Sequence, residues 1–135
     1  MSENERNEKT CAELVKKHYR GRIHDLKKMY KAECDGEEDK ELGPLNEYGL
    51  GFDFVEAGTF KKQREPYWRY QLSWGGPADE FRIYLNGEIE YWYLDWFDGA
   101  PYQVEGEDYD LIRNIIEPLI ECNEEYQRGK VNWDD

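Results

Sequence analysis

The sequence is poor in the residues that carry covalent and nucleophilic chemistry. Its 135 residues include three cysteines, two histidines, two serines and two threonines. Cys11, Cys34 and Cys122 lie far apart, which argues against a disulfide framework or the close pairs of a zinc site. His18 and His24 are six residues apart on an expected helix, about 240° around its axis, so they cannot serve one ligand or one nucleophile. The composition therefore gives little support for nucleophilic catalysis.

Long apolar runs are also missing. No run approaches the roughly 20 residues that a membrane-spanning helix needs, and residues 1–9 are polar and charged, unlike a secretory signal. Together with the unpaired cysteines, this predicts a cytoplasmic protein with reduced thiols. The glycine groups at 49–51 and 75–77 lack the helix and lysine that nucleotide-binding loops require. We expect no cofactor and no metal.

Aromatic and acidic residues are what the chain has in excess. Aromatics make up 16% of the chain and hydrophobic residues 39%, enough to build the core of one domain over residues 1–135. The net charge is −13, but residues 1–34 carry nine basic and six acidic residues, a balance of +3, which leaves −16 for the rest. Such a field repels nucleic-acid backbones and membrane surfaces and attracts basic proteins.

Hydrophobic spacing predicts a helix near each end of the chain. Over residues 10–34, apolar and aromatic side chains recur mostly every three or four positions. A second apolar stripe predicts a helix over residues 108–128, with Glu107 or Asp108 as its cap and Gly129 at its end. Both helices present one apolar face, so both are expected to pack on a common core.

The middle of the chain alternates between apolar and polar residues, which is typical of β-strands. Four strands are expected, over residues 50–55, 67–74, 79–85 and 88–96. The order α-β-β-β-β-α predicts an α+β fold, in which an antiparallel sheet of about four strands is flanked by an N-terminal and a C-terminal helix. Both helices are expected on one face, leaving the other face rich in Trp, Tyr and acids.

The turn at residues 86–87, Asn-Gly, predicts a hairpin whose register can be tested by side-chain pairing. A two-residue loop places Ile83 opposite Glu90, whereas a three-residue loop places Ile83 opposite Ile89 and Arg82 opposite Glu90. The second register matches apolar with apolar and basic with acidic side chains. We therefore expect the three-residue loop, closed by a glycine in the left-handed conformation.

The stretch over residues 88–98 interleaves acids with the densest run of aromatics. It fits a strand buried on both faces, and it also fits an exposed surface where Trp and Tyr anchor a basic partner. The second interpretation, extended to the acids that follow, predicts ten partner-binding residues. They are Glu88, Glu90, Trp92, Asp95, Trp96, Asp98, Glu105, Glu107, Asp108 and Asp110.

Residues 73–100 carry a recognisable pattern. It consists of the turn at 75–77, an apolar strand through Phe81 and Ile83, and an acidic-aromatic strand that ends in Asp-Trp-Phe at 95–97. This pattern resembles a group of small uncharacterised acidic proteins carried by plasmids, phages and integrative elements. The resemblance implies a mobile-element context, in which small acidic proteins such as anti-restriction and anti-CRISPR proteins block host nucleases by resembling DNA. It transfers no functional residue.

These observations lead to one main hypothesis and three alternatives. The main hypothesis is a non-enzymatic interaction protein that binds a basic nucleic-acid site of a host defence protein, such as a nuclease or CRISPR effector, without binding nucleic acid itself. An antitoxin or immunity-type module for a basic partner is the first alternative. A carboxylate-dependent carbohydrate or metal enzyme is the second, and it requires two carboxylates facing each other in a cleft. A homodimer, joined through the basic first helix and an acidic sheet, is the third.

Overall fold

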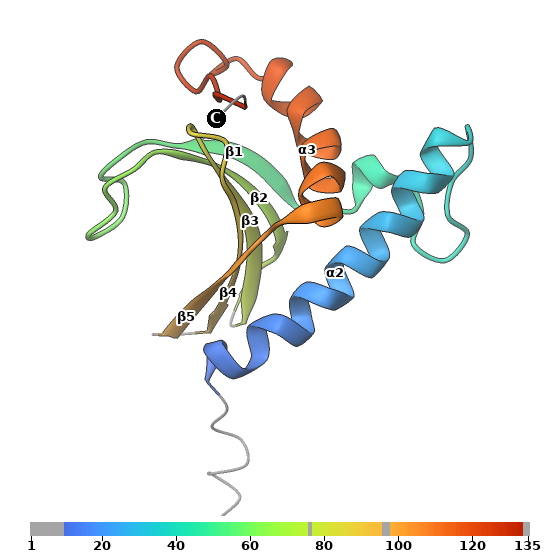
Figure 1. Ribbon diagram of the computed structural model, residues 1–135, viewed down its shortest axis with the longest axis horizontal. Helices are drawn as coiled ribbons and strands as arrows, with labels where there is room; N and C mark the ends of the chain where they lie inside the picture. The colour runs from blue at the N-terminus through green and yellow to red at the C-terminus, as the bar shows by residue number, and fades with distance from the viewer. Residues whose placement is uncertain (1–9, 76, 96–97, 134–135) are drawn as a thin grey trace, which may run out of the picture.

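The computed structural model describes residues 10–75, 77–95 and 98–133. Its elements are α2 (Cys11–Cys34), the short 3-10 helix η1 (Leu45–Glu47), β1 (Gly51–Val55), β2 (Tyr67–Ser73), β3 (Ala78–Tyr84), β4 (Ile89–Asp95), β5 (Asp98–Gln103) and α3 (Gly106–Glu121). The five strands form one antiparallel sheet in chain order, β1 to β5. Figure 1 shows both helices on the convex face of this curved sheet, which leaves its concave face open.

The α+β fold and the placement of both helices on one face confirm the sequence-based prediction, but the sheet has five strands rather than about four. The additional strand is β5, whose sequence is Asp-Gly-Ala-Pro-Tyr-Gln. Glycine and proline are depleted in strands and break the apolar alternation that identifies one. Pro101 is tolerated because β5 lies at the edge of the sheet, where one side of the strand needs no ladder hydrogen bonds.

Helix α2 begins and ends close to the expected residues. The Thr10 side chain caps its start by accepting a hydrogen bond from the backbone N–H of Glu13 at 3.3 Å. The buried side chains of α2 form a stripe and recur every three or four residues, as the sequence predicted, and near the end of the helix Met29 is buried while Tyr30 is half-buried. The stripe consists of Cys11, Val15, Tyr19, Ile23, Leu26 and Met29.

Helix α3 differs from the prediction at both ends. It is capped by Glu105, whose side chain makes no capping hydrogen bond, so the expected caps Glu107 and Asp108 lie inside its first turn. It stops before Gly129 because the chain turns back over the end of the sheet. There the buried Trp68 donates from its indole nitrogen to the carbonyl of Gly129 at 2.6 Å. The residues after α3 therefore close the core rather than lengthen the helix.

The hairpin between β3 and β4 has the predicted register. Ile83 pairs with Ile89 and Arg82 with Glu90, and Gly87 adopts a positive φ of 93°. Trp74, the last residue of the strand expected over residues 67–74, lies beyond β2 and is 73% exposed. Within β2, Trp68, Tyr70 and Leu72 alternate onto one face and are buried in the core.

A buried ion pair joins α2 to the sheet. Asp79 on β3 is 3% exposed and accepts two hydrogen bonds from the Arg22 guanidinium, at 2.7 and 2.9 Å. The hydroxyl of Tyr91 donates to the same carboxylate at 2.5 Å, and Ser73 also donates to it. Arg22 donates in turn to the hydroxyl of Tyr48 at 3.0 Å. Burial by itself would raise the pKa of Asp79, but the bonds from Arg22, Ser73 and Tyr91 outweigh it and the pKa is lowered.

Replacing Arg22 by leucine should lower the free energy of unfolding by about 3–5 kcal/mol, because the Asp79 carboxylate stays buried without its counter-charge. Urea denaturation followed by fluorescence measures this. Lys28→Met is the matched control, since Lys28 is 40% exposed and lies 3.7 Å from Asp39. That loss should stay below about 1 kcal/mol. Equal losses in the two variants would show that the buried pair has no special role.

The stability of the wild type should depend on pH through Asp79. A carboxyl group whose folded pKa is lowered stabilises the fold fully above its unfolded pKa of about 3.9 and loses that contribution as pH falls through the folded value. The difference in unfolding free energy between the wild type and Asp79→Asn should therefore shrink below about pH 4. Urea titrations of both proteins over a pH series test this. A constant difference down to about pH 2 would contradict the assignment.

Candidate functional site

The concave face of the sheet combines aromatic residues with paired charges. Two of its acids are bonded to arginines of the same face: Arg69 donates to Asp53 at 2.7 Å and Arg82 to Glu80 at 2.7 Å. The sequence predicted a face rich in Trp, Tyr and acids, but most aromatic side chains of the sheet lie on the helix-covered face, and the acids of the concave face alternate with arginines. The side chains on the concave face include Asp53, Tyr67, Arg69, Glu80, Arg82, Tyr84, Glu90, Trp92 and Leu94.

Two of the ten predicted contact residues, Glu90 and Trp92, belong to this concave face. Glu90 accepts hydrogen bonds from the Tyr84 hydroxyl at 2.7 Å and from the Trp92 indole nitrogen at 3.0 Å. The guanidinium of Arg82 lies 4.2 Å from the centre of the Trp92 ring and 4.8 Å from that of Tyr67. Glu90 and Trp92 therefore contact their own sheet, and both are half-buried.

Asp95 and Asp98 lie where β4 joins β5, at the end of β4 that is farther from the β3–β4 hairpin. One carboxylate oxygen of Asp98 accepts a hydrogen bond from the backbone N–H of Cys11 at 2.8 Å and so helps to cap α2. This bond lowers the pKa of Asp98. Along β4, Asp95 is roughly 23 Å from Glu88. The predicted set is therefore not one patch, and its member Trp96 lies outside the described residues.

Asp108 has a structural role. It accepts a hydrogen bond from the Tyr19 hydroxyl at 2.7 Å, and the amino group of Lys27 lies 3.6 Å from it. Burial first, and then this bond, raise the pKa of Tyr19. Since Tyr19 and Lys27 belong to α2, Asp108 holds the first turn of α3 against that helix. We assign it to the fold more readily than to a binding surface.

The remaining predicted acids meet where the β3–β4 hairpin contacts the start of α3. The hydroxyl of Tyr109 donates to the carbonyl of Gly87 at 2.5 Å and joins the two elements. The acids Glu107 and Asp110 point outward from α3, on the same face as two acids that sequence reasoning missed, Glu117 and Glu121. These four fall within about 80° of one another around the helix axis. Their spacing, opposite the apolar stripe of α3, was the signal that could have identified them.

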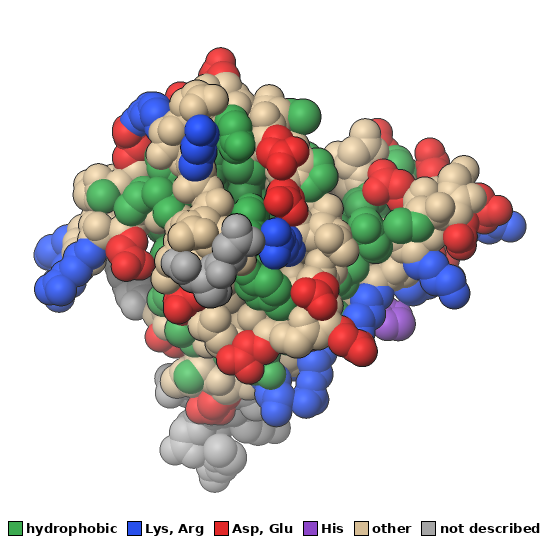
Figure 2. Space-filling model, turned by 45° about the horizontal axis from the view of Figure 1, so that its top comes forward, with side chains coloured by type: hydrophobic (Ala, Val, Ile, Leu, Met, Phe, Trp, Pro, Cys, Tyr) green, Lys and Arg blue, Asp and Glu red, His purple; other side chains and the backbone are tan. Residues whose placement is uncertain are grey.

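We call the following six residues the acidic surface: Glu88, Glu105, Glu107, Asp110, Glu117 and Glu121. Within residues 10–75, 77–95 and 98–133, five of the six carboxylates have no hydrogen-bond or ion-pair partner; Glu117 accepts from Arg113 at 3.4 Å. Figure 2 shows acidic side chains spread over the face of the molecule that it presents. The six residues of the acidic surface differ from the other acids because they lie together, on α3, at its start and on the adjoining hairpin.

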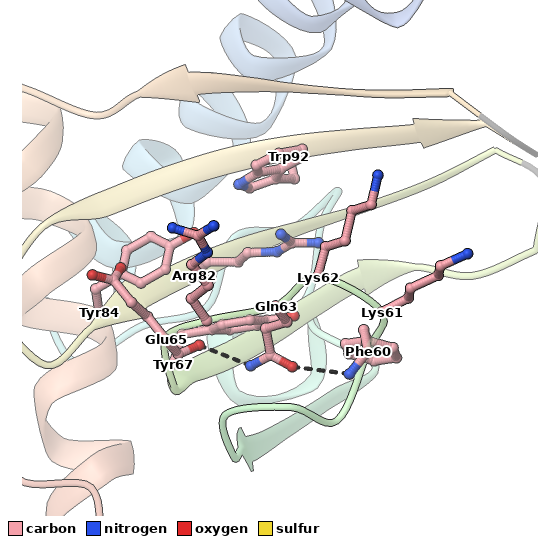
Figure 3. Close-up of a pocket in the computed structure, with 10 residues that line it drawn as sticks. Phe60, Lys61, Lys62, Gln63, Glu65, Tyr67, Arg82, Tyr84 and Trp92 are labelled. Atoms are coloured by element: carbon pink, nitrogen blue, oxygen red, sulfur yellow. Dashed lines mark hydrogen bonds between the residues drawn. The ribbon is translucent and has the colours of Figure 1, made fainter.

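A second feature lies on the concave side, where the β1–β2 loop over residues 56–66 overhangs the sheet (Figure 1). Two adjoining cavities, of about 580 and 690 Å³, open there and share Phe60, Tyr67 and Arg82 as lining residues. We call the two together the concave groove. The loop is held by Gln63, which accepts from the backbone N–H of Phe60 at 3.0 Å and donates to the carbonyl of Glu65 at 2.8 Å (Figure 3).

Catalytic and metal-binding arrangements can be compared with these surfaces. On the concave face, the Glu80 side chain is bonded to Arg82, and Glu90, beside the groove, accepts from Tyr84 and Trp92. Glu65 also lines the groove, but among the described lining residues it has no second unbonded carboxylate to face. Among the described residues, no group of three or more His, Cys, Asp or Glu side chains is placed to hold a metal ion. Within the same residues, no helix is long and apolar enough to cross a membrane.

Known proteins provide no external guide to these surfaces. No protein-family model, curated protein or solved structure matches the chain. The charge, exposure and rigidity of the acidic surface and of the concave groove are therefore the basis for proposing a function.

Replacing Tyr109 by phenylalanine should loosen the join between α3 and the hairpin, because the Gly87 carbonyl loses its donor. We expect a loss of about 0.5–1.5 kcal/mol in unfolding free energy, and faster amide hydrogen exchange in the first turn of α3. Tyr126→Phe is the control, since within the described part of the chain its hydroxyl makes no hydrogen bond. It should change stability by less than about 0.5 kcal/mol. Unchanged exchange in Tyr109→Phe would contradict the proposed contact.

Proposed function

We propose that this chain is a non-enzymatic interaction protein that uses its acidic surface to bind a basic site on a partner protein, of the kind that normally holds nucleic acid. The observation that supports this most directly is the row of outward carboxylates on α3. The opposite side of the helix is locked into the core by Leu111, Ile112, Ile115, Ile116 and Ile120. A rigid support of this kind lets the carboxylates bind with little ordering cost.

The spacing of the charges is comparable to that of a DNA strand. Glu107 and Glu121 are 14 residues apart on one helix, which corresponds to about 21 Å along its axis. A strand of duplex DNA carries about six phosphates over that length. The acidic surface presents six carboxylates over a slightly greater length, since Glu88 and Glu105 extend it beyond the start of α3. A basic groove that fits phosphates would therefore meet a similar density of negative charge.

The charge of the whole chain supports the same partner. A net charge of −13 attracts basic surfaces at long range and speeds association, and this attraction weakens as salt screens it. The resemblance of residues 73–100 to acidic proteins of mobile elements suggests host nucleases or CRISPR effectors as partners. An antitoxin or immunity-type protein would use the same surface against a basic toxin, and the identity of the partner distinguishes the two classes.

Reversing four charges on α3 should abolish this recognition. In the variant, Glu107, Asp110, Glu117 and Glu121 are all replaced by lysine. The wild type should reduce DNA cleavage by a sensitive member of a panel of purified restriction and CRISPR nucleases. The variant should require at least about tenfold more protein, because four attractive contacts become repulsive. The effect of the wild type should weaken between about 50 and about 300 mM salt.

A matched control separates the acidic surface from net charge. Lysine at the four exposed acids Glu33, Asp35, Glu37 and Glu38, near the end of α2, changes the net charge by the same amount at another place. This control should inhibit nearly as well as the wild type. Equal loss in both variants would leave only a general charge effect, and a wild type without effect on any member of the panel would contradict the inhibitor class.

A further inference from the structure

The concave groove is separated from the acidic surface by the sheet itself. Helix α3 packs on the convex face of the sheet (Figure 1), whereas the residues that line the groove belong to the concave face. The groove is lined by side chains from β2, β3 and β4 and overhung by the β1–β2 loop. It can therefore be occupied whether or not the acidic surface is bound, and its chemistry can be considered independently.

The unpaired charges at this groove are mainly positive, unlike those of the chain as a whole. Lys61, Lys62 and Arg64 line the first cavity, are exposed, and have no hydrogen-bond or ion-pair partner in the described portion of the chain. Figure 2 shows basic side chains gathered on the projection at its left, which corresponds to this loop in Figure 1. In the floor, Glu80 is bonded to Arg82, and Glu65 is the one acid among the described residues that line the first cavity, against three unpaired cations. An occupant of the first cavity should therefore carry negative charge.

The second cavity has a different character. Trp74, Ala78 and Leu94 line it, together with Phe60, which both cavities share. Trp74 is 73% exposed and Phe60 is 47% exposed, so two large apolar side chains at this groove are accessible to solvent. Exposed aromatic side chains at a concave surface are typical of recognition sites, where they become anchors on binding. The apolar part of an occupant should lie here.

Arg82 lines both cavities of the groove, and its side chain is held in place by its neighbours. Its guanidinium carbon lies 4.8 Å from the centre of the Tyr67 ring and 4.2 Å from that of the Trp92 ring (Figure 3). Its Nε donates to Glu80 at 2.7 Å. Because Glu80 already neutralises this cation, Arg82 belongs to the floor of the groove, and Lys61, Lys62 and Arg64 are the cations left for a carboxylate of the occupant. Lys61 and Lys62 extend from the overhanging loop on the same side of the sheet (Figure 3).

The length of the groove indicates a polymer in extended form. It follows β3 from Tyr84 in the first cavity to Ala78 in the second, which corresponds to roughly 20 Å along a strand. A polypeptide of about six residues covers that length when extended. A nucleic acid fits less well, because its phosphates continue beyond the three unpaired cations into the field of a chain with net charge −13.

We propose that the concave groove binds an extended acidic peptide segment of a partner protein. The carboxylates of this segment lie at Lys61, Lys62 and Arg64, and an apolar side chain of the segment packs against Trp74 and Leu94. The protein then has two binding surfaces of opposite sign on opposite faces of one sheet. The acidic surface recognises a basic site, and the concave groove recognises an acidic segment.

Selection from a phage-display library of random peptides of about seven residues tests this proposal. Peptides selected on the wild-type protein should carry at least two Asp or Glu residues beside an aromatic or aliphatic residue. The selected peptide, labelled with a fluorophore, is then titrated with each variant by fluorescence anisotropy. Lys61→Glu/Lys62→Glu/Arg64→Glu should weaken binding at least about tenfold, and Trp74→Ala about threefold to tenfold.

The control is Lys16→Glu/Lys17→Glu/Arg20→Glu, which reverses three exposed charges of α2 away from the groove. It should change affinity by less than about twofold at physiological salt. Near-UV circular dichroism shows whether each variant keeps its fold. Failure to select a peptide, selected peptides without acids, or an equal loss in the control would each overturn the proposal. So would a single-stranded oligonucleotide that binds more tightly than the peptide and depends on the same three loop residues.

Discussion

The ion pair between Arg22 and Asp79 is the interaction on which the arrangement of this fold depends. It places a charged group from the middle of α2 directly on the buried face of β3, beside the irregularity in pairing between β2 and β3 at residues 71–73. Burying two charges is costly, and here the cost is offset by hydrogen bonds from Tyr91 and Ser73 to the carboxylate. An apolar contact would tolerate sliding of the helix, whereas this network is satisfied in one position only. We infer that it sets the register of α2 on the sheet.

With α2 fixed, the two faces of the sheet acquire different roles. The convex face is covered by both helices and forms the core, in which Trp68, Phe81 and Tyr91 are fully buried. The concave face has no helix over it, and its aromatic and charged side chains bond to one another across strands, so that Tyr67 and Glu80 are buried there as well. The curvature that brings the convex face against the helices also creates the concave groove beneath the β1–β2 loop. The same packing thus produces the core and the second candidate surface.

The acids of this chain divide into two kinds according to their partners. Asp53, Asp79 and Glu80 neutralise arginines, while Asp98 and Asp108 hold the starts of α2 and α3. Such carboxylates belong to the fold, and their charge is largely used within it. Most of the outward carboxylates of α3 contact only solvent, so their charge is not neutralised within the fold. Recognition can draw on these and not on the first kind, so net charge alone overstates the surface available to a partner.

Local pattern determined the parts of this protein that depend on neighbours in the chain. The stripe of α2 and the hairpin register that pairs Ile83 with Ile89 follow from spacing and turn chemistry, and both were predicted. Strand β5 was missed because an edge strand with glycine and proline needs no apolar alternation. Only tertiary structure decided that Glu90 and Trp92 face the concave side, that Asp98 caps α2, and that the residue 56–66 loop overhangs a groove. Each of these depends on contacts between residues that are distant in the sequence. The spacing of side chains along one strand or helix shows which of them share a face, but it does not determine which distant element packs against that face.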